Sequence, residues 1–484
     1  MTSLTIVWVA LPFLAGFTIY LLPQAGRILA LGVALVSAVY AVSLFGQSTT
    51  LDIRLLDSFG VTLLVDNLSA WFILTNALVT AAVVIYCWPT AKTAFFYTQA
   101  IILHGSINAT FICADFISLY VALEVIGIAA FLLIAYPRSN KTLWVALRYL
   151  FISNTAMLFY LVGAILVYQT HQSFAFTGLR GAPIEAVALI VGGLLTKGGI
   201  FVSGLWLPLT HSEAESPVSA LLSGVVVKAG VFPLVRFALM MEEWDPLLRL
   251  LGVAAALLGV IYALTETDAK RVLACSTLSQ IGWILAVPPA AGFFALAHGL
   301  AKAALFLTVG NLPSRDLTQL RQQPIYTSLW IPLTLASLSI SGFPGLVGFG
   351  AKLLTLKAAL PWQTVPLNVA ALGTAILYAQ FIFLPHQRHE TEPGQGAKPG
   401  LWLAVGWLLG AMVLVNGAYL GAYTGPNLIK VLAIVGGGWL IQRLLLSQVT
   451  LTLPRGMEAF EHLIGVMSLT LMALFWMVGT WLAL

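Results

Sequence analysis

The stretch GGLLTKGGIFVSGLWLPLTHSEAES, residues 192–216, places one lysine inside a long apolar run. Lys197 stands directly before Gly198 and Gly199. A charged side chain at bilayer mid-depth costs roughly 2.5–3.5 kcal/mol on insertion scales, so such a residue needs a reason to be there. The neighbouring glycines favour a broken helix, because irregular backbone inside a membrane is tolerated only where it lines protein or a hydrated cavity.

Composition extends this interpretation to the whole chain. Of its 484 residues 60% are hydrophobic and 8% charged, and the mean hydropathy is +0.96. These values exclude an ordinary soluble protein. Apolar runs of roughly 17 to 25 residues recur along the chain, about the length with which an α-helix crosses ~30 Å of hydrocarbon. Since they lack the ~10-residue alternation of a β-barrel, we predict an all-α polytopic membrane protein.

The apolar runs predict sixteen membrane spans, one of them interrupted. They lie near 4–22, 28–45, 68–88, 95–112, 116–136, 144–168, 184–208, 218–241, 247–265, 273–289, 293–310, 329–358, 365–384, 401–420, 428–446 and 464–484. The first run lacks a basic leader region and a small-residue cleavage site, so we expect a retained helix and not a signal peptide. Segment 49–67 alternates polar and apolar residues and predicts an outer hairpin.

The basic residues fit a topology better than a nucleic-acid surface. The isoelectric point is about 9.0, but the lysines and arginines lie in short loops and form no basic block. With the N-terminus outside a bacterial plasma (inner) membrane, outer loops hold mainly Arg54, Arg180 and Arg249. The inner loops hold Arg27, Lys92, Arg138, Lys141, Lys270, Arg271, Arg315, Arg321, Arg388, Lys398, Arg443 and Arg455. This asymmetry satisfies the positive-inside rule.

Further charges lie within predicted spans: Glu124, Lys228, Lys302 and Lys352. His298 precedes Lys302 by four residues, so both side chains leave the same helix face. Each charge alone is equally well explained by an interfacial position or a structural ion pair. Yet the predicted spans hold four lysines, Lys197 included, and a single mid-span carboxylate, so ion pairing cannot neutralise all four lysines. Because an amine buried without a full counter-charge exchanges protons more readily, we predict a proton relay with Glu124 and Lys197 as a switching pair.

Two broken helices suggest an internal symmetry. Glycines follow Lys197, and the sequence SGFPGLVGFG precedes Lys352. Paired interruptions point to inverted repeats around a mid-membrane site. We predict the N-terminal helices and hairpin over 1–94, repeats over 95–241 and 247–384, and C-terminal helices over 401–484. The alternative is that these glycines only permit close helix packing.

Other polar residues near helix ends have simpler interpretations. His211 is either a helix-cap or interfacial histidine or a participant in proton entry or inter-repeat signalling. Asp66 and Asp115 are predicted helix N-caps. A solvated surface cluster is expected for Glu266, Asp268, Lys270 and Arg271. The three cysteines lack metal-site or disulfide spacing and are expected to serve packing.

Several motifs together resemble a known family. They are DFISLYVALEV (115–125), LLTKGGIFVSGLWLPLTHSEAESPVSALLSGVVVKAGVFPLVRF (194–237), DAKRVLACSTLSQIG (268–282), AHGLAKAALFLTVGNL (297–312) and SGFPGLVGFGAKLLTLK (341–357). In this order they resemble the proton-conducting antiporter-like subunits of the complex I membrane arm and of Mrp-type multisubunit Na+/H+ antiporters. NATFICADFISLYVALEVIGIAAFLLIAY (108–136) and LRYLFISN (147–154) are most similar to the D-type antiporter chain of the Mrp complexes.

The resemblance implies a fourteen-helix core of two inverted five-helix repeats, with about two C-terminal helices outside it. It implies proton-relay roles for Glu124, Lys197, Lys228 and Lys352, and secondary roles for His298, Lys302 and His211. It further implies other membrane subunits as partners, exchange of protons for a cation such as Na+, and neither a cofactor, a metal nor nucleic acid. The alternative is a proton-pumping subunit of a complex I-like oxidoreductase or membrane hydrogenase, with the redox centres in partner chains.

Overall fold

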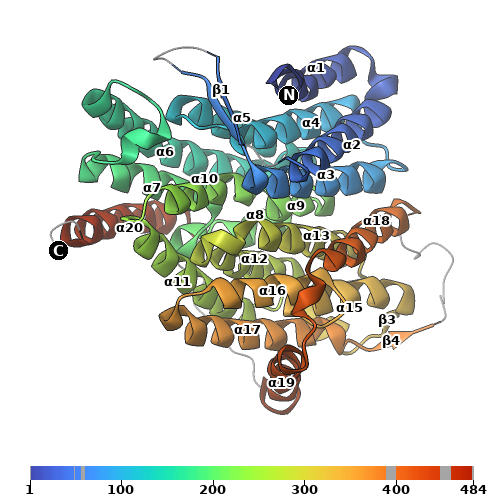
Figure 1. Ribbon diagram of the computed structural model, residues 1–484. Helices are drawn as coiled ribbons and strands as arrows, with labels where there is room; N and C mark the ends of the chain where they lie inside the picture. Colours follow the sequence, from blue (N-terminus) through green and yellow to red (C-terminus); the bar gives the residue numbers. More distant parts are fainter. Residues whose placement is uncertain (1, 48–49, 56–59, 389–398, 447–458, 482–484) are drawn as a thin grey trace.

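A bundle of long helices lying side by side forms the protein (Figure 1). The computed structural model describes residues 2–47, 50–55, 60–388, 399–446 and 459–481. Within these ranges twelve helices are long and apolar enough to cross a membrane, and a bent helix pair is a thirteenth candidate. The prediction of an all-α polytopic membrane protein is confirmed. Of the remaining predicted spans, 95–112 and the interrupted 329–358 correspond to shorter helices, and 273–289 corresponds to a more polar helix.

The N-terminal part holds three helices and a hairpin: α1 (Thr2–Leu21), α2 (Gly26–Phe45), β1 (Leu51–Arg54), β2 (Thr62–Val65) and α3 (Asn67–Cys87). The strands pair antiparallel, with Leu51 opposite Val65. The predicted hairpin is therefore confirmed, although 48–49 and 56–59 lie outside the described residues. Asp66 caps α3 as predicted, because its Oδ1 accepts from the Ser69 N–H at 2.9 Å.

The first predicted repeat contains α4 (Ala94–Thr110), α5 (Phe116–Ile134), α6 (Asn140–His171), α7 (Ile184–Gly198), α8 (Leu207–Glu213), α9 (Ser216–Leu221), the π-helical turn η4 (Leu222–Val226) and α10 (Val227–Met240). Asp115 caps α5 through the Ser118 N–H at 2.7 Å, which confirms its predicted role. A capping box of Ser139 and Thr142 begins α6.

The second predicted repeat contains α11 (Asp245–Leu264), α12 (Ala269–Ala286), α13 (Ala291–Val309), α14 (Leu317–Leu320), β3 (Ile325–Tyr326), α15 (Thr327–Ser341), α16 (Val347–Ala358) and α17 (Pro361–Ile382). β3 pairs with β4 (His386–Gln387) beyond α17. Each predicted repeat contains a helix interrupted at glycines. The repeat boundaries remain a prediction.

Three helices form the C-terminal part: α18 (Pro399–Asn416), α19 (Gly425–Ile441) and α20 (Phe460–Trp481). α18 packs on α3 and α13, and α19 packs on α17, but α20 lies against α7 on another side of the bundle (Figure 1). Gly192 of α7 makes that contact close, since a Cβ there would lie 2.5 Å from Leu471 Cδ2. Of the residues used for the loop-charge prediction, Lys398 and Arg455 lie outside the described ranges.

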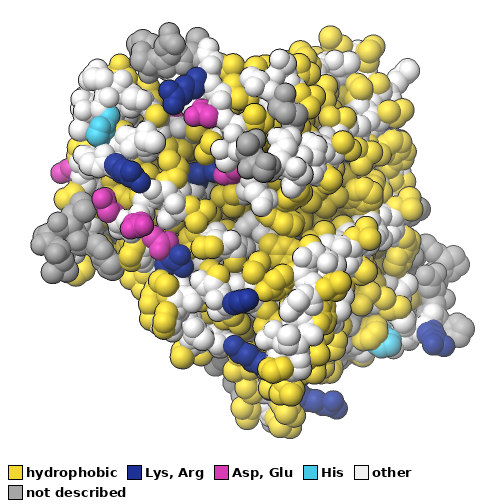
Figure 2. All heavy atoms as spheres, viewed as in Figure 1, with side chains coloured by type: hydrophobic (Ala, Val, Ile, Leu, Met, Phe, Trp, Pro, Cys, Tyr) yellow, Lys and Arg dark blue, Asp and Glu magenta, His cyan; other side chains and the backbone are white. Residues whose placement is uncertain are grey.

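Hydrophobic side chains cover much of the outer surface. Figure 2 shows a face on which hydrophobic side chains predominate and the charged side chains are few, most of them toward the left and the bottom of the view. Outward residues of α1, α6 and α20 include Phe17, Phe151 and Trp476, each more than half exposed. This is the inverse of a soluble protein and suits contact with lipid or with other membrane subunits.

Candidate proton path

Lys197 lies in the last turn of α7, at the first helix break. Gly199 ends this helix in the left-handed conformation (φ 64°), which a residue without Cβ adopts readily. The chain resumes as Phe201–Glu213 at 41° to α7. The predicted broken helix is thus present. The carbonyl end of α7 carries partial negative charge, which favours a cation such as the Lys197 ammonium.

The Lys197 amine is buried between α5 and α6. Its Nζ donates to Ser153 Oγ at 2.5 Å. Gly127 of α5 leaves room for it, since a Cβ there would lie 3.0 Å from Nζ. Glu124 lies one turn before Gly127, on the same helix face, and its charge interacts with that of Lys197.

Glu124 and Lys197 nevertheless form no ion pair within the described ranges. Glu124 Oε1 is buried and has no hydrogen-bond partner there. The carboxylate and the amine therefore interact at a distance, with Ser153 as the direct partner of the amine. Sequence reasoning missed Ser153, because a serine on a membrane helix usually bonds to its own backbone.

Lys228 lies at the centre of the bundle, where its side chain is fully buried. It is the second residue after η4, and its Nζ donates to the backbone carbonyls of Gly224 at 2.5 Å and Ser223 at 3.3 Å. The same Nζ lies 3.2 Å from His298 Nδ1 of α13. π-Helical turns are rare and frequently mark functional sites. The structure thus joins two predicted relay residues that are 70 positions apart in the chain.

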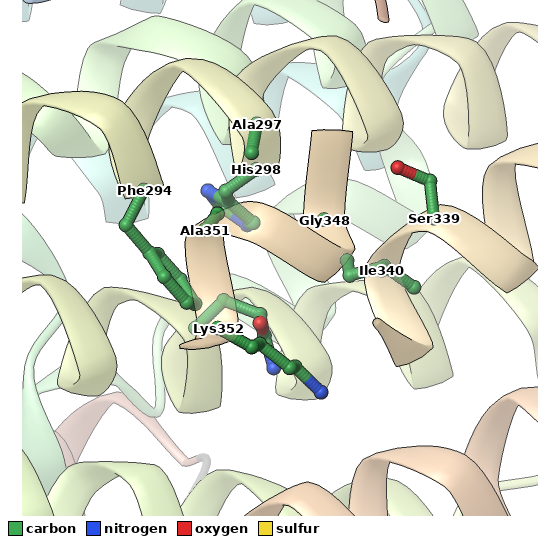
Figure 3. A pocket seen from close by; sticks show the side chains of 9 residues that line it. Phe294, Ala297, His298, Ser339, Ile340, Gly348, Ala351 and Lys352 are labelled. Carbon is green, nitrogen blue, oxygen red and sulfur yellow. The ribbon is translucent and has the colours of Figure 1, made fainter. Parts of the chain in front are cut away.

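His298 links Lys228 to the second broken helix. Its Nε2 is buried and has no partner in the described part of the chain. The imidazole borders a cavity of about 10 Å³, whose wall also includes Lys352, Gln280 and Ser339 (Figure 3). This volume is about that needed for one water molecule, and the wall supplies several polar groups for it. His298 and Lys352 therefore line the same small cavity.

Lys352 lies on α16, just after the second break. α15 ends at Ser341, and Gly342 follows it with φ 88°. Lys352 Nζ donates to the Ser341 carbonyl at 3.3 Å and lies 5.6 Å from the centre of the Trp283 ring. No carboxylate pairs with Lys352 among the described ion pairs.

Lys302 and His211 form a second group beside this path. Lys302 Nζ donates to the Leu273 carbonyl at 2.7 Å and lies 5.6 Å from the centre of the Tyr378 ring. His211 of α8 is fully buried and stacks on Phe306 at 4.8 Å. The structure places His211 in the last turn of α8, enclosed by protein, and its part in proton entry or inter-repeat signalling stays a prediction.

The cluster expected at the solvated surface is mostly buried instead. Arg271 and Glu266 form a two-bond ion pair at 2.7 and 3.0 Å, and both are less than 10% exposed. Lys270 is also buried and donates to the Ala214 carbonyl at 2.7 Å. The expectation failed because the turn before α12 packs against the α8–α9 junction. Asp268, which caps α12, is the member that fits a loop position.

A second ion pair joins the hairpin end of α3 to α10. Arg236 donates to both carboxylate oxygens of Asp66 and to Ser69 Oγ. Burial alone would raise the pKa of the Asp66 carboxyl, but the Arg236 charge and the hydrogen bonds from Arg236 and Ser69 hold it below its ordinary value. Asp66 thus has a structural partner besides its capping role.

Curated relatives of this chain are subunits of quinone oxidoreductases. It is 27% identical to NAD(P)H-quinone oxidoreductase chain 4-2 of Synechocystis sp. over 417 residues, which cover 76% of this chain and 75% of the relative. It is 28% identical to NADH-quinone oxidoreductase subunit N of Desulforudis audaxviator over 379 residues, 70% of this chain and 75% of the relative.

Two solved membrane complexes contain chains of the same fold. One is the membrane-bound sulfane sulfur reductase, an archaeal respiratory membrane complex, with a TM-score of 0.76, 19% identity and coverage of 92% of this chain and 99% of that one. The other is the Mrp complex from Dietzia sp., with a TM-score of 0.73, 18% identity and coverage of 95% and 98%. At these identities the likeness concerns the fold.

Residues 113–377 match the family described as NADH:quinone oxidoreductase/Mrp antiporter, TM, over more than half of the chain. All seven predicted relay residues lie within this match. This antiporter-like, multi-pass membrane chain therefore belongs to the NADH:quinone oxidoreductase/Mrp antiporter family.

Proposed function

We propose that this chain translocates protons along its buried titratable side chains, as one subunit of a multisubunit membrane complex. The observation that carries the proposal is the succession of Lys228, His298 and Lys352. The first two are in contact, and the last two line the same small cavity. Three titratable groups from three helices thus meet inside a bundle whose surface is apolar.

The geometry suits stepwise transfer. The Lys228 ammonium gives a proton to His298 Nδ1, and the imidazolium releases the proton on its Nε2 to a water in the cavity. A neutral Lys352 amine takes that proton and becomes ammonium, and Lys228 is left neutral. The imidazole then moves its remaining proton from Nδ1 back to Nε2 through water before the next transfer. Each step moves one proton between groups at hydrogen-bond range or through one water, as proton transfer requires.

Glu124 and Lys197 act at the other end of this path. Protonation of Glu124 removes the negative charge that attracts Lys197, and Ser153 then remains as the fixed partner of the amine. The pair thereby changes charge without a change of fold. α7 and α10 pack closely here, since a Cβ at Gly198 would lie 3.2 Å from the Gly230 backbone. This packing brings the helix of Lys197 against that of Lys228.

For the driving force we propose exchange of a cation, with Na+ as the first choice, in a complex of the Mrp type. The resemblance to the D-type antiporter chain of the Mrp complexes and the fold likeness to a chain of an Mrp complex support this. No group of three or more His, Cys, Asp or Glu residues able to hold a metal ion occurs in the described ranges. A companion subunit would then contribute the cation path.

The second candidate is proton pumping driven by electron transfer in partner subunits. The names of the curated relatives, which are chains of quinone oxidoreductases, favour it. Both candidates use the same proton path in this chain and differ in the subunits beside it.

Everted membrane vesicles that contain the assembled complex separate the two candidates. Acidification of the vesicle lumen is followed with a pH-sensitive dye. If cation exchange is correct, added Na+ discharges a preformed proton gradient; if redox coupling is correct, a reductant with quinone builds the gradient without Na+. Lys197→Ala is expected to abolish either response while the complex still assembles. Normal transport by assembled Lys197→Ala complexes would contradict the proposed path.

A further inference from the structure

A pocket of about 380 Å³ lies where the two predicted repeats meet at one end of the bundle. Its wall is formed by the end of α3, the turn that follows it, the end of α5, the α8–α9 junction, and the adjoining ends of α12 and α13. The polar lining residues are Tyr86, Thr90, Lys92, Tyr136, Glu215, Ser216 and Lys270. By the loop charges, this end is the one predicted to face the inside.

One ion pair crosses the wall of this pocket. Lys92 Nζ and Glu215 Oε2 are 2.5 Å apart, and the ammonium also lies 4.4 Å from the centre of the Tyr136 ring. The side chain of Glu215 is 33% exposed and that of Lys92 is 14% exposed. Water in the pocket therefore reaches the carboxylate, while the lysine is the more enclosed partner.

Buried titratable side chains lie inward of the pocket. Lys270 in its wall donates to the Ala214 carbonyl, beside Glu215. His211, four residues before Glu215 in the chain, is fully buried, and neither ring nitrogen has a partner in the described part of the chain. Buried imidazole nitrogens are normally satisfied, so water is the expected partner here. The His211 ring interacts electrostatically with Lys302, which lies one turn before the stacked Phe306, and with Lys270.

We propose that this pocket is the mouth through which protons enter the path, and that the Lys92–Glu215 ion pair is its gate. The inference rests on the proposed function and adds to it a place of entry, a gating residue and a route over His211 to Lys302. Its ligand is a hydrated proton, since the pocket offers one carboxylate already neutralised by a lysine and not an array of oxygen ligands for a metal cation.

The transfer is a balanced exchange of one proton. A hydronium in the pocket protonates the Glu215 carboxylate and leaves as water, and the ion pair with Lys92 opens. Neutral Glu215 passes the proton through water to a ring nitrogen of His211, regains its negative charge and pairs with Lys92 again. The imidazolium then gives the proton to a neutral Lys302 amine. Entry therefore resets the gate after each proton.

Glu215→Gln removes the charge at the gate and keeps the side-chain shape. We expect the initial rate of proton transport in vesicles to fall about 10-fold, since the Lys92 ammonium is then unpaired and repels cations from the mouth, and charge in a cleft changes local ion concentrations by about that factor. The matched control is Glu213→Gln, two residues away. Glu213 pairs with the exposed Lys141 at 2.9 Å and is not part of the pocket wall. Equal transport rates for Glu215→Gln and Glu213→Gln would contradict the gating role of the Lys92–Glu215 ion pair.

Blocking the mouth provides a test that does not depend on the ion pair. Ala91 is an exposed residue of the pocket wall. In a chain whose three cysteines are replaced by alanine, Ala91→Cys is treated with a bulky, membrane-impermeant thiol reagent in everted vesicles. We expect modification to stop transport, relative to the same variant before treatment. Lys141→Cys is the control, and its modification is expected to leave transport intact.

The outcomes separate this proposal from the function on which it rests. Transport that continues after Ala91→Cys is fully modified would refute the mouth, while the proposed proton path would stand. If the unmodified complex moves no protons with either driver, the proposed function itself fails. If the Glu215→Gln complex fails to assemble in the membrane, that variant gives no test of the gate. The modification of Ala91→Cys still tests the mouth, because it is measured on an assembled complex.

Discussion

The two broken helices hold their lysines in different surroundings. Lys197 belongs to the half that ends at the break, and its amine leaves α7 toward Ser153 and the charge of Glu124. Lys352 belongs to the half that begins after the break and reaches back to the last carbonyl of α15. Its other close neighbour is the Trp283 ring.

This difference assigns different properties to the two lysines. The charge near Lys197 changes when Glu124 gains or loses a proton, so its state follows another titratable group. The partners of Lys352 are a carbonyl dipole and an aromatic face, which do not titrate. Lys352 therefore changes charge mainly by exchanging its own proton through the cavity it shares with His298. The first site responds to a neighbour, and the second hands protons on.

The largest expected effect is at Lys352. Lys352→Met keeps the length of the side chain but removes the amine, and we expect proton transport to fall by at least about 100-fold, as for loss of a proton-transferring group. Lys357→Met, on the exposed side of the same helix, is the control and should transport normally. Initial rates per assembled complex give the comparison. Near-normal transport by Lys352→Met would mean that the second break carries no proton.

A smaller loss is expected at Glu124. Glu124→Gln removes the charge that acts on Lys197 but leaves the bond from Lys197 to Ser153, so we expect transport to fall about 10-fold, the weaker end of electrostatic coupling in a cleft. Glu185→Gln, exposed at the start of α7, serves as control. If Glu124→Gln transports as slowly as Lys352→Met, then transport requires the Glu124 carboxylate as strictly as it requires the Lys352 amine, and the proposed difference between the two sites is wrong.

Ser153→Ala sharpens the same comparison from the other side. It removes a hydrogen bond to a charged amine, worth roughly 1.5–3 kcal/mol, while Glu124 remains. We expect a loss of about 10-fold in transport, the lower end of that range, and a larger loss when Ser153→Ala is combined with Glu124→Gln than the product of the two single losses. A double-mutant cycle on the rates measures this coupling. Simple multiplication of the two effects would show that Ser153 and Glu124 act on Lys197 independently.

The smallest effect on transport is expected at Asp66, outside both breaks. Asp66→Asn weakens the link from the hairpin to Arg236 and should reduce the free energy of unfolding by roughly 1–3 kcal/mol while transport per folded complex stays unchanged. Because folding lowers the Asp66 pKa, the ion pair stabilises fully at neutral pH and is lost only as the pH falls through the lowered pKa. Asp52→Asn, in the exposed pair with Arg54 on the same hairpin, should leave the thermal midpoint unchanged. Equal midpoints for both variants would contradict this structural role.

Features set by local sequence were predictable. The glycines near Lys197 and the glycine-rich stretch before Lys352 predicted the two helix breaks, which lie at Gly199 and Gly342. Asp66 and Asp115 predicted where α3 and α5 begin. The spacing of His298 and Lys302 placed both on one face of a single helix. These features depend on backbone conformation within a few residues, which residue type largely determines.

Contacts between distant helices were not predictable. Nothing in the sequence around Lys228 indicates His298 as its neighbour or the π-helical turn before it. Ser153 resembled any other serine on a membrane helix, and the Glu266–Arg271 pair resembled surface charges. Their positions follow from how the helices pack, which a pattern along one chain does not encode.

The position of α20 has a practical consequence for experiments on this chain. Leu471 of α20 packs against α7 at Gly192, where no side chain intervenes. α20 therefore covers one side of α7, although α20 begins almost 280 positions after the start of α7. Deleting α20 would open that flank to lipid tails four to five residues from Lys197. A deletion of α20 would therefore also disturb the surroundings of Lys197 at the first helix break.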